Sequence, residues 1–176
     1  MTIPAFTPLL VRPATLADAA DIATIYNAGI ATRNATFETI DRSKHDVRGW
    51  FNPPGASHHP FLVAERPDRR VAGWGRASEY RPRDCYASIA EFSVYVAADA
   101  RRGGVGDTLL TAFLDACASA GITKLVARVF PENSASRALG ARHAFREVGT
   151  YERHGKLDGR WRDVVVVERL IRDNMT

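Results

Sequence analysis

Cysteine and lysine are scarce in this chain of 176 residues, and long apolar runs are missing. Its two cysteines, Cys85 and Cys117, are too few for a disulfide framework and fit a reducing compartment. No apolar stretch approaches the roughly 20 residues that cross a bilayer. The first residues also lack the basic segment and hydrophobic core of a secretion signal. We therefore expect a cytoplasmic protein that is not a membrane protein.

The positive charge is carried by arginine, which supplies 21 of the 24 basic residues, and the net charge is only +4. Basic residues are spread from Arg12 to Arg172 and do not cluster with interleaved aromatic residues, as a nucleic-acid surface would require. We therefore expect no nucleic-acid partner. His58 and His59 have no carboxylate or thiol at ligand spacing beside them, so no metal site is expected.

Length and composition favour one folded domain over residues 1–176. The hydrophobic fraction of 45% is too high, and the net charge too small, for a disordered chain. A domain of this size buries about 70% of the surface that its unfolded chain exposes, so it needs no disulfide, metal or partner in order to fold. No internal repeat, low-complexity tract or linker divides the sequence.

The spacing of apolar residues predicts helices and an antiparallel meander in the first part of the chain. Helical spacing from Leu16 to Ile30, opened by a capping box between Thr15 and Asp18, predicts the first helix. The run at 88–97 alternates strictly, with Glu91 on the face opposite Phe92. The other expected elements are a strand at 9–13, a helix at 43–51 and strands at 61–65 and 71–80.

After Val96 the spacing of apolar residues changes from that of a strand to that of a helix. A long amphipathic helix is expected over 104–120, with Gly121 as its C-terminal cap. It is followed by a strand at 124–130, a helix at 134–143 and strands at 145–152 and 161–170. Strands that alternate with helices in this order imply at least one parallel pairing at the centre of a mixed sheet.

The loop from Arg101 to Gly106 carries the strongest chemical signal. Three glycines in four positions at a strand-to-helix junction let backbone amides approach a ligand, and these amides with the helix dipole suit a diphosphate. A tight turn with glycine caps would also explain them. The chain has neither GxxxxGK[ST] nor GxGxxG, which leaves nucleotide hydrolysis and a dinucleotide fold without support.

Arg101-x-x-Gly104-x-Gly106, between the strand FSVYV and a long helix, resembles the Q/R-x-x-G-x-G/A signature of the GNAT superfamily of N-acetyltransferases. The segment PENSASRAL at 131–139 is similar to the second coenzyme A motif of that superfamily, and the likeness covers residues 10–171. The segments ATFET, YRPRDCY, AEFSVYV and GRWRDV most resemble the phosphinothricin acetyltransferase group. The resemblance implies an α/β (α+β) fold: a mixed, centrally splayed sheet of six to seven strands flanked by about four helices.

The resemblance also implies the residues that would bind acetyl-CoA. These are Val94, Tyr95, Val96, Arg101, Arg102, Gly103, Gly104, Val105, Gly106, Asn133 and Ser136. A backbone amide near Val94 to Val96 would stabilise the tetrahedral oxyanion. Asn133 would hydrogen-bond the pantetheine arm, although a helix N-cap explains that residue equally well.

Acetyl transfer needs a base, since an amine attacks the thioester only when it is neutral. The resemblance places Glu91 in this catalytic position, and the alternative is an exposed strand carboxylate in a salt bridge. The motif departs from the family at Gly140, where many relatives have a Tyr or His that protonates the departing thiolate. Water, Tyr95 or His143 could take over, or the thiolate could leave unaided.

The same resemblance implies that Phe37, Arg81, Arg83 and Tyr86 bind the acceptor. Arg81 and Arg83, with Pro82 between them, would form a stiff cationic ledge that grips a carboxylate by paired hydrogen bonds. A solvated hairpin tip is the alternative. Trp161 and Asp163 could close the pocket, pack, or contact a second copy, since relatives of this group are commonly homodimers.

The expected function is transfer of the acetyl group from acetyl-CoA to the amine of a small amino-acid-like acceptor, with a glutamate base. Phosphinothricin, methionine sulfoximine and ordinary L-amino acids are the acceptors that the resemblance favours, and acetylation would detoxify such an analogue. Two alternatives stay open: a protein or peptide N-acetyltransferase, and a coenzyme A-binding sensor with little turnover, which Gly140 suggests.

Overall fold

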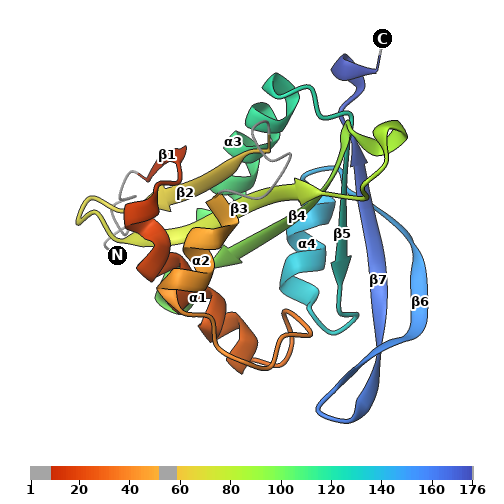
Figure 1. The fold of residues 1–176 in the computed structure, drawn as a ribbon, viewed down its shortest axis with the longest axis horizontal. Coiled ribbons are helices and arrows are strands. Elements are labelled where there is room, and N and C mark those ends of the chain that lie inside the picture. The colour runs from red at the N-terminus through yellow and green to blue at the C-terminus, as the bar shows by residue number, and fades with distance from the viewer. Residues whose placement is uncertain (1–8, 52–58, 176) are drawn as a thin grey trace, which may run out of the picture.

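The computed structural model describes residues 9–51 and 59–175, and within them seven strands form one sheet in the order β1-β2-β3-β4-β5-β7-β6 (Figure 1). The strands are β1 (Leu10–Pro13), β2 (Phe61–Glu65), β3 (Val71–Glu79), β4 (Ile89–Val96), β5 (Lys124–Val129), β6 (Arg146–Leu157) and β7 (Arg160–Leu170). The helices are α1 (Ala19–Ala31), α2 (Lys44–Arg48), α3 (Val105–Ser119) and α4 (Ser134–Arg142), joined in places by short 3-10 turns. The expected number of strands and helices is confirmed.

The sheet opens between β4 and β5. These two strands form its one parallel pair in the described residues, and the pairing joins only Ile89–Glu91 to Lys124–Val126. Beyond Glu91, β4 continues beside β3 as far as Val96, whereas β5 continues beside β7. Figure 1 shows β4 and β5 diverging from this point, with α4 in the angle between them. The expected central splay and the expected parallel pairing are both confirmed.

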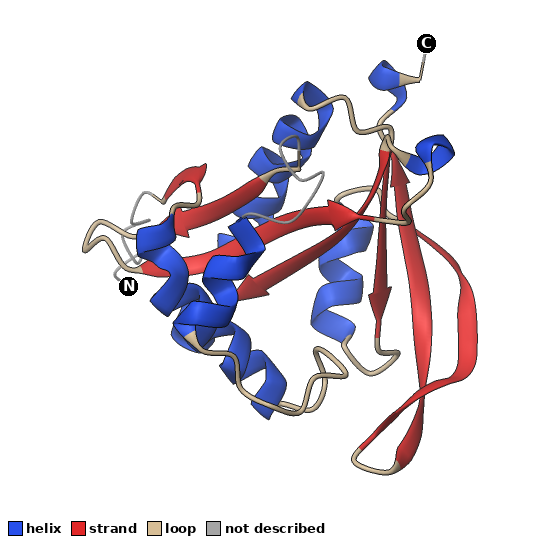
Figure 2. Ribbon diagram, in the orientation of Figure 1, coloured by secondary structure: helices blue, strands red, loops and turns tan. Residues whose placement is uncertain are grey.

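Helices lie on both faces of the sheet (Figure 2), and each face carries a hydrophobic cluster. On one face, Leu109 and Phe113 of α3 are fully buried against the central strands. On the other face, Ile22 of α1 and Val47 of α2 pack with Trp74 of β3. Burying each such side chain contributes about 1.5–3 kcal/mol, so the helices that frame the splay are held by their apolar stripes.

Side chains of β4 alternate between these faces as the sequence predicts. Phe92 and Val94 pack in the cluster that contains α3, whereas Tyr95 packs in the cluster with α1 and α2. Glu91 and Ser93 share the face of Tyr95, because residues two apart on a strand point the same way. The strand therefore presents its polar side chains toward α1.

An ionic cluster fixes the start of α1 against the first two strands. Arg12 donates two hydrogen bonds of 2.8 Å to Asp18, and its Nε donates to Glu65 Oε2 at 2.7 Å. Asp18 also accepts from the backbone amide and hydroxyl of Thr15, which confirms the expected capping box. The neighbouring Arg12 guanidinium holds the pKa of the Asp18 carboxyl below its usual value.

Strand β6 departs from the sequence prediction in length, whereas β7 begins one residue early and ends at Leu170 as predicted. Strand β6 runs to Leu157, five residues past the expected end at Glu152, and nearly all of its residues are exposed. Two register shifts interrupt its pairing with β7, between Glu147 and Gly149 and between Tyr151 and Gly155. These irregularities break the two-residue alternation, so the hydrophobic pattern ended the predicted strand too early.

Candidate active site

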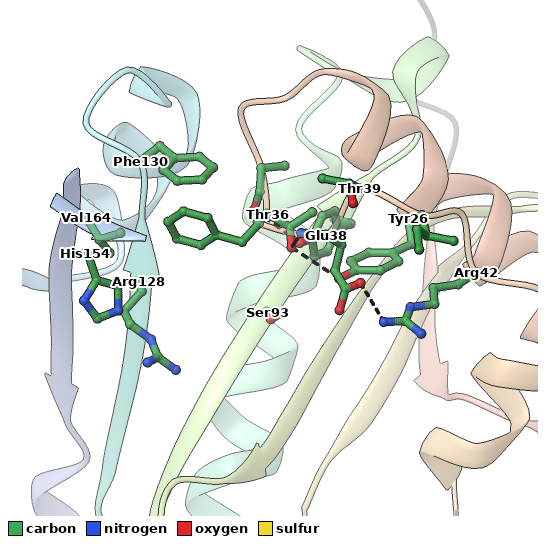
Figure 3. Close-up of a pocket in the computed structure, with 14 residues that line it drawn as sticks. Tyr26, Thr36, Glu38, Thr39, Arg42, Ser93, Arg128, Phe130, His154 and Val164 are labelled. Atoms are coloured by element: carbon green, nitrogen blue, oxygen red, sulfur yellow. Dashed lines mark hydrogen bonds and ion pairs between the residues drawn. The ribbon is translucent and has the colours of Figure 1, made fainter. Parts of the chain in front are cut away.

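A pocket of about 550 Å³ lies where β4 and β5 diverge, on the face that α1 covers (Figure 3). Residues from α1 and the segment after it form one side, β4 crosses the middle, and β5 with the last hairpin forms the other side. Its lining residues are Tyr26, Ala35, Thr36, Phe37, Glu38, Thr39, Ile40, Arg42, Ser93, Tyr95, Arg128, Phe130, His154 and Val164.

The segment 35–42 forms the side of the pocket next to α1. Asn27 of α1 fixes this segment, because its side chain accepts from the Arg42 amide at 2.8 Å and donates to the Arg42 carbonyl at 3.0 Å. Glu38 and Arg42 form an ion pair of 2.6 Å within it. Both charged side chains line the pocket, and each neutralises the other.

An aromatic group lies beneath the pocket. The ring of Tyr95 stacks on Trp74 at 4.7 Å between centroids and meets the edge of Tyr26 at 5.0 Å. The Tyr95 hydroxyl donates to the carbonyl of Ala35 at 3.4 Å. Burial raises the pKa of Tyr95 far above its ordinary value, so this hydroxyl keeps its proton. A group this weakly acidic is a poor proton donor for a departing thiolate, although it can still donate a hydrogen bond.

Glu91 stands at the point where the two strands separate. It belongs to the last residue pair of the parallel ladder, and its side chain is 29% exposed. The carboxylate forms an ion pair with Arg128 of β5, which lines the pocket. The salt bridge that the sequence left as an alternative is therefore present, while the role of Glu91 as the base stays a prediction.

The opposite side of the pocket has apolar side chains, one imidazole and the Arg128 guanidinium. Phe37 packs edge-on against Phe130 at 4.9 Å, and His154 lies 6.4 Å from the Phe37 ring. A side chain at Gly155 would place its Cβ 2.9 Å from Phe37, so the hairpin can approach this ring only with glycine there. Phe37 is thus a pocket residue, and its contact with an acceptor stays a prediction.

The glycine-bearing loop begins α3 next to the splay. Arg102 and Gly104 adopt positive φ angles of 63° and 78°, which turn the chain sharply before Val105. Within the described residues, no amide of residues 101–106 donates a hydrogen bond to the protein. Free amides at the start of a 15-residue helix form an anion-binding arrangement. Binding of a diphosphate at these amides stays a prediction.

The backbone of β4 offers further free donors. The amide of Ala97 donates to Ala72 on the β3 side at 2.8 Å, and amides along an antiparallel ladder point alternately to its two sides. The amides of Val94 and Val96 therefore point to the side that β5 has left. These are the backbone positions that the resemblance assigned to the oxyanion.

Asn133 is the N-cap of α4, which was one of the two roles predicted for it. Its side-chain oxygen accepts from the Ser136 amide at 3.1 Å, and its amide nitrogen donates to the Asn34 carbonyl at 3.0 Å. A primary amide has two donor hydrogens and two lone pairs, so one of each stays available. A contact with a coenzyme is compatible with the capping role.

Arg81, Arg83 and Tyr86 are not brought to the pocket. They lie in the connection between β3 and β4, where both arginines are exposed and neither lines the cavity. The Arg81 guanidinium covers the ring of Tyr80 at 5.2 Å, and that ring contacts Tyr86 at 5.6 Å. Their binding of an acceptor stays a prediction.

The other residues left open in the sequence also lie outside the pocket lining. His143 is 3.2 Å from Asp107 in the first turn of α3, and a Cβ at Gly140 would meet Phe145 at 3.5 Å. Trp161 is exposed beneath Lys156, and Asp163 accepts from the Arg153 amide at 2.8 Å. Gly140 therefore faces an apolar side chain.

Sequence reasoning missed several polar pocket residues. Ser93 follows from the predicted alternation of β4, and Glu38 is adjacent to Phe37 in the quoted ATFET segment. Arg128 and His154 gave no such signal, since their positions depend on which strands become neighbours and on the irregular pairing of β6.

Neither a membrane span nor a metal cluster is found in the described part of the chain. None of its helices has the length and apolar character to span a bilayer. Residues 9–51 and 59–175 also contain no group of three His, Cys, Asp or Glu placed to hold a metal ion. His58 lies outside the described residues.

Comparisons with known proteins converge on one family. Residues 8–146 match the model of an acetyltransferase (GNAT) domain. An N-acetyltransferase of Streptomyces griseus is 36% identical over 159 residues, which cover 88% of this chain and 82% of that protein. A phosphinothricin N-acetyltransferase of Alcaligenes faecalis is 36% identical over 149 residues, which cover 84% of this chain and 75% of that protein.

A solved structure agrees in fold as well as in sequence. It is a GNAT superfamily phosphinothricin acetyltransferase from Sinorhizobium meliloti in complex with AcCoA. It aligns with a TM-score of 0.85 and 28% identity, over 92% of this chain and 88% of the other. The likeness therefore extends through the splayed sheet and the elements that frame the pocket.

Proposed function

This chain belongs to the acetyltransferase (GNAT) family, and from this premise we propose that it transfers an acetyl group from acetyl-CoA to the amine of a small amino-acid-like acceptor. The observation that carries the proposal is the opening between β4 and β5. On one side it has a pocket with paired charges, and beside it lie free backbone amides at the start of α3. The single domain predicted over residues 1–176 is supported by the one sheet that contains all described strands.

The coenzyme would bind along the α3 side of the opening. Its diphosphate would accept hydrogen bonds from the amides of residues 101–106, where the positive end of the helix dipole also favours an anion. The pantetheine arm would then pair with the free edge of β4 at Val94 and Val96, with Asn133 and Ser136 at the start of α4. This path ends with the thioester at the splay.

Glu91 is the proposed base for the acceptor amine. Its carboxylate lies on the pocket face of β4, where it could take the ammonium proton directly or through a water molecule. The ion pair with Arg128 restrains the carboxylate at the mouth of the splay. The neutral amine would attack the thioester carbonyl, and the amide of Val94 or Val96 would donate to the oxyanion that forms.

The thiolate of coenzyme A would leave without a dedicated acid from the protein. A thiol of ordinary pKa, about 8.5, leaves as a tolerable anion near neutral pH and takes its proton from water. Gly140 carries no side chain, and Tyr95 is too weakly acidic for this step. The absence of the usual acid therefore limits the rate without preventing the reaction.

The pocket favours a small acceptor over a peptide. Its volume of about 550 Å³ lies in the range of about 300–1,000 Å³ that is typical of small-molecule sites. The segment 35–42 and the hairpin with His154 bound it on two sides (Figure 3). Phosphinothricin, methionine sulfoximine and L-amino acids are the acceptor types we propose, and acetylation would abolish the cationic amine of a toxic analogue.

A cytoplasmic homodimer is the form in which we propose that the enzyme works. Support for self-association comes from exposed apolar side chains on the last hairpin, since Val148, Tyr151 and Trp161 are each at least half exposed. Light scattering of the purified protein would measure its mass, and a monomer at all concentrations would contradict the dimer.

The acceptor panel tests the proposed function directly. Purified protein is mixed with acetyl-CoA and phosphinothricin, methionine sulfoximine, several L-amino acids, or a peptide with a free N-terminus, while thiol release is followed. We expect release with at least one of the small acceptors. Release with the peptide alone would favour a protein acetyltransferase. Tight binding of acetyl-CoA, without thiol release in the presence of any of these amines, would favour the coenzyme A-binding sensor that Gly140 suggests.

A further inference from the structure

Arg76 of β3 is a partly buried cation that has no polar partner among residues 9–51 and 59–175. Eight arginines of the described residues are partly buried, and each of the other seven donates a hydrogen bond to a carboxylate or a backbone carbonyl. They are Arg12, Arg33, Arg42, Arg66, Arg137, Arg162 and Arg169. Arg76 has neither a hydrogen bond nor an ion pair within the described chain. Its five donor hydrogens therefore have no acceptor in the part of the chain that the structure describes.

Aromatic rings surround the Arg76 guanidinium. Its central carbon lies 5.8 Å from the centre of the Trp50 ring and 5.9 Å from that of Phe61. Both rings pack against Trp74, so they hold the guanidinium in place without supplying a negative charge. Burial lowers the pKa of Arg76 from its ordinary value, yet a guanidinium stays charged at physiological pH. A desolvated cation of this kind is most stable when an anion joins it.

The position of Arg76 is directly beside the pocket. It is the cross-strand partner of Ser93, which lines the cavity, and opposite residues of an antiparallel pair share a face of the sheet. The next residue of β3 on this face, Ser78, is the partner of Glu91. Arg76 and the proposed base are therefore about one strand repeat apart, roughly 7 Å along the strand direction.

The charges within the pocket explain why an additional cation matters. Glu38 is paired with Arg42, and Glu91 is paired with Arg128. These pairs leave no excess charge on the lining, whereas Arg76 adds one positive charge at its border. An acceptor whose amine has lost its proton to Glu91 and that carries an acidic group matches this distribution.

We infer that Arg76 binds the anionic group of the acceptor, a carboxylate or phosphinate, while the amine of the same molecule meets Glu91. This inference rests on the proposed function and gives it an acceptor-specificity residue. The planar guanidinium matches two oxygens of such a group with parallel hydrogen bonds. Arg76 thereby takes the task that the sequence assigned to the exposed Arg81 and Arg83.

The experiment compares acceptors that differ in one charge. Methionine sulfoximine is paired with its carboxamide, which keeps the amine and side chain but has no anion, and phosphinothricin adds a second acidic group. KM and kcat are measured for the wild type, Arg76→Met and Arg76→Lys. Arg172→Met serves as the matched control, since it removes one positive charge from an exposed residue at the far end of the chain.

We expect Arg76→Met to raise the KM of at least one acid by about tenfold or more, with the KM of the carboxamide and of acetyl-CoA unchanged. A higher KM for both acids would assign Arg76 to the α-carboxylate. A higher KM for phosphinothricin alone would assign it to the side-chain anion. Arg76→Lys should restore part of the affinity, because it keeps the charge but not the planar fork. Arg172→Met should behave as the wild type.

An equal rise in KM for the acid and for its carboxamide would overturn the inference, since it would mean that Arg76 only supports the fold. An unchanged KM in Arg76→Met would overturn it as well. Failure of the proposed function has a different signature, namely no acetyl transfer from the wild type to any acceptor. In that case calorimetric titration with phosphinothricin decides: binding that Arg76→Met abolishes supports the anion site, and equal or absent binding in both proteins refutes it.

Discussion

The two faces of β4 differ in what their side chains contact. Phe92, Val94 and Val96 pack into the hydrophobic cluster beneath α3. Glu91, Ser93 and Tyr95 face α1, where they meet an ion pair, a cavity and an aromatic stack. A single strand with a period of two thus separates the contacts that stabilise the sheet from those proposed to perform the reaction. Substitutions on the two faces should have separable effects.

Glu91→Gln should have the largest effect, and it should act on the rate alone. Loss of a general base typically lowers kcat by about 10²–10⁴-fold. The pair with Arg128 is partly exposed, and exposed pairs contribute only about 0–1 kcal/mol, so the free energy of unfolding should barely change. Thiol release and urea unfolding measure both quantities, with acetyl-CoA affinity as the control. A rate equal to that of the wild type would remove Glu91 as the base.

Phe113→Ala should have the opposite result on the other side of the sheet. The Phe113 side chain is fully buried, and removing such a ring costs about 3–5 kcal/mol through lost burial and the cavity that remains. We expect a large decrease in the urea midpoint, while the kcat of the molecules that stay folded at low temperature is unchanged. A specific loss of kcat with full stability would contradict the division between the two faces.

Asp18→Asn tests whether the ionic cluster behind α1 is structural. The carboxylate is stabilised by Arg12, so its pKa is lower in the folded chain than in the unfolded chain. This stabilisation is present above the ordinary Asp pKa of about 3.9 and is lost as the pH falls through the lowered value. The substitution should cost about 1.5–3 kcal/mol at pH 7 and less at pH 3. Urea unfolding at the two pH values measures this, and a cost independent of pH would refute the ionic origin.

Gly29→Ala tests the packing on the face of the sheet that α1 covers. Of these substitutions it should have the smallest effect on stability and activity. An added Cβ would lie 2.9 Å from the Tyr95 ring, which stacking on Trp74 holds in place. Overpacking of this kind costs about 1–3 kcal/mol, and the displaced ring should raise the KM of the acceptor. Gly49→Ala is the matched control, because a Cβ built there meets no atom within 4 Å among the described residues beyond its immediate neighbours along the chain. Equal thermal midpoints for both variants would show that the ring yields freely.

Local patterns predicted the parts of this molecule that depend on local physics. The alternation of β4 placed Glu91 on the face opposite Phe92, and the glycines after Val96 indicated a loop whose amides donate no hydrogen bond within the described residues. The parallel pairing at the centre followed from the order of strands and helices.

Contacts between distant segments could not be predicted in the same way. The partner of Glu91 is Arg128 on a strand that only the sheet order brings alongside. Arg81 and Arg83 do not line the cavity, so their predicted contact with the acceptor is untested, and Arg76 is marked only by its cross-strand partner Ser93, which lines it. His154 escaped notice because irregular pairing in β6 re-aims the side chains of that hairpin.

A crystal structure of the protein soaked with acetyl-CoA tests the central claim most directly. The account predicts the diphosphate on the amides of residues 101–106, the pantetheine arm along Val94 and Val96, and the thioester at the opening that faces Glu91. A coenzyme bound at any other place, with those amides still free of ligand, would contradict it.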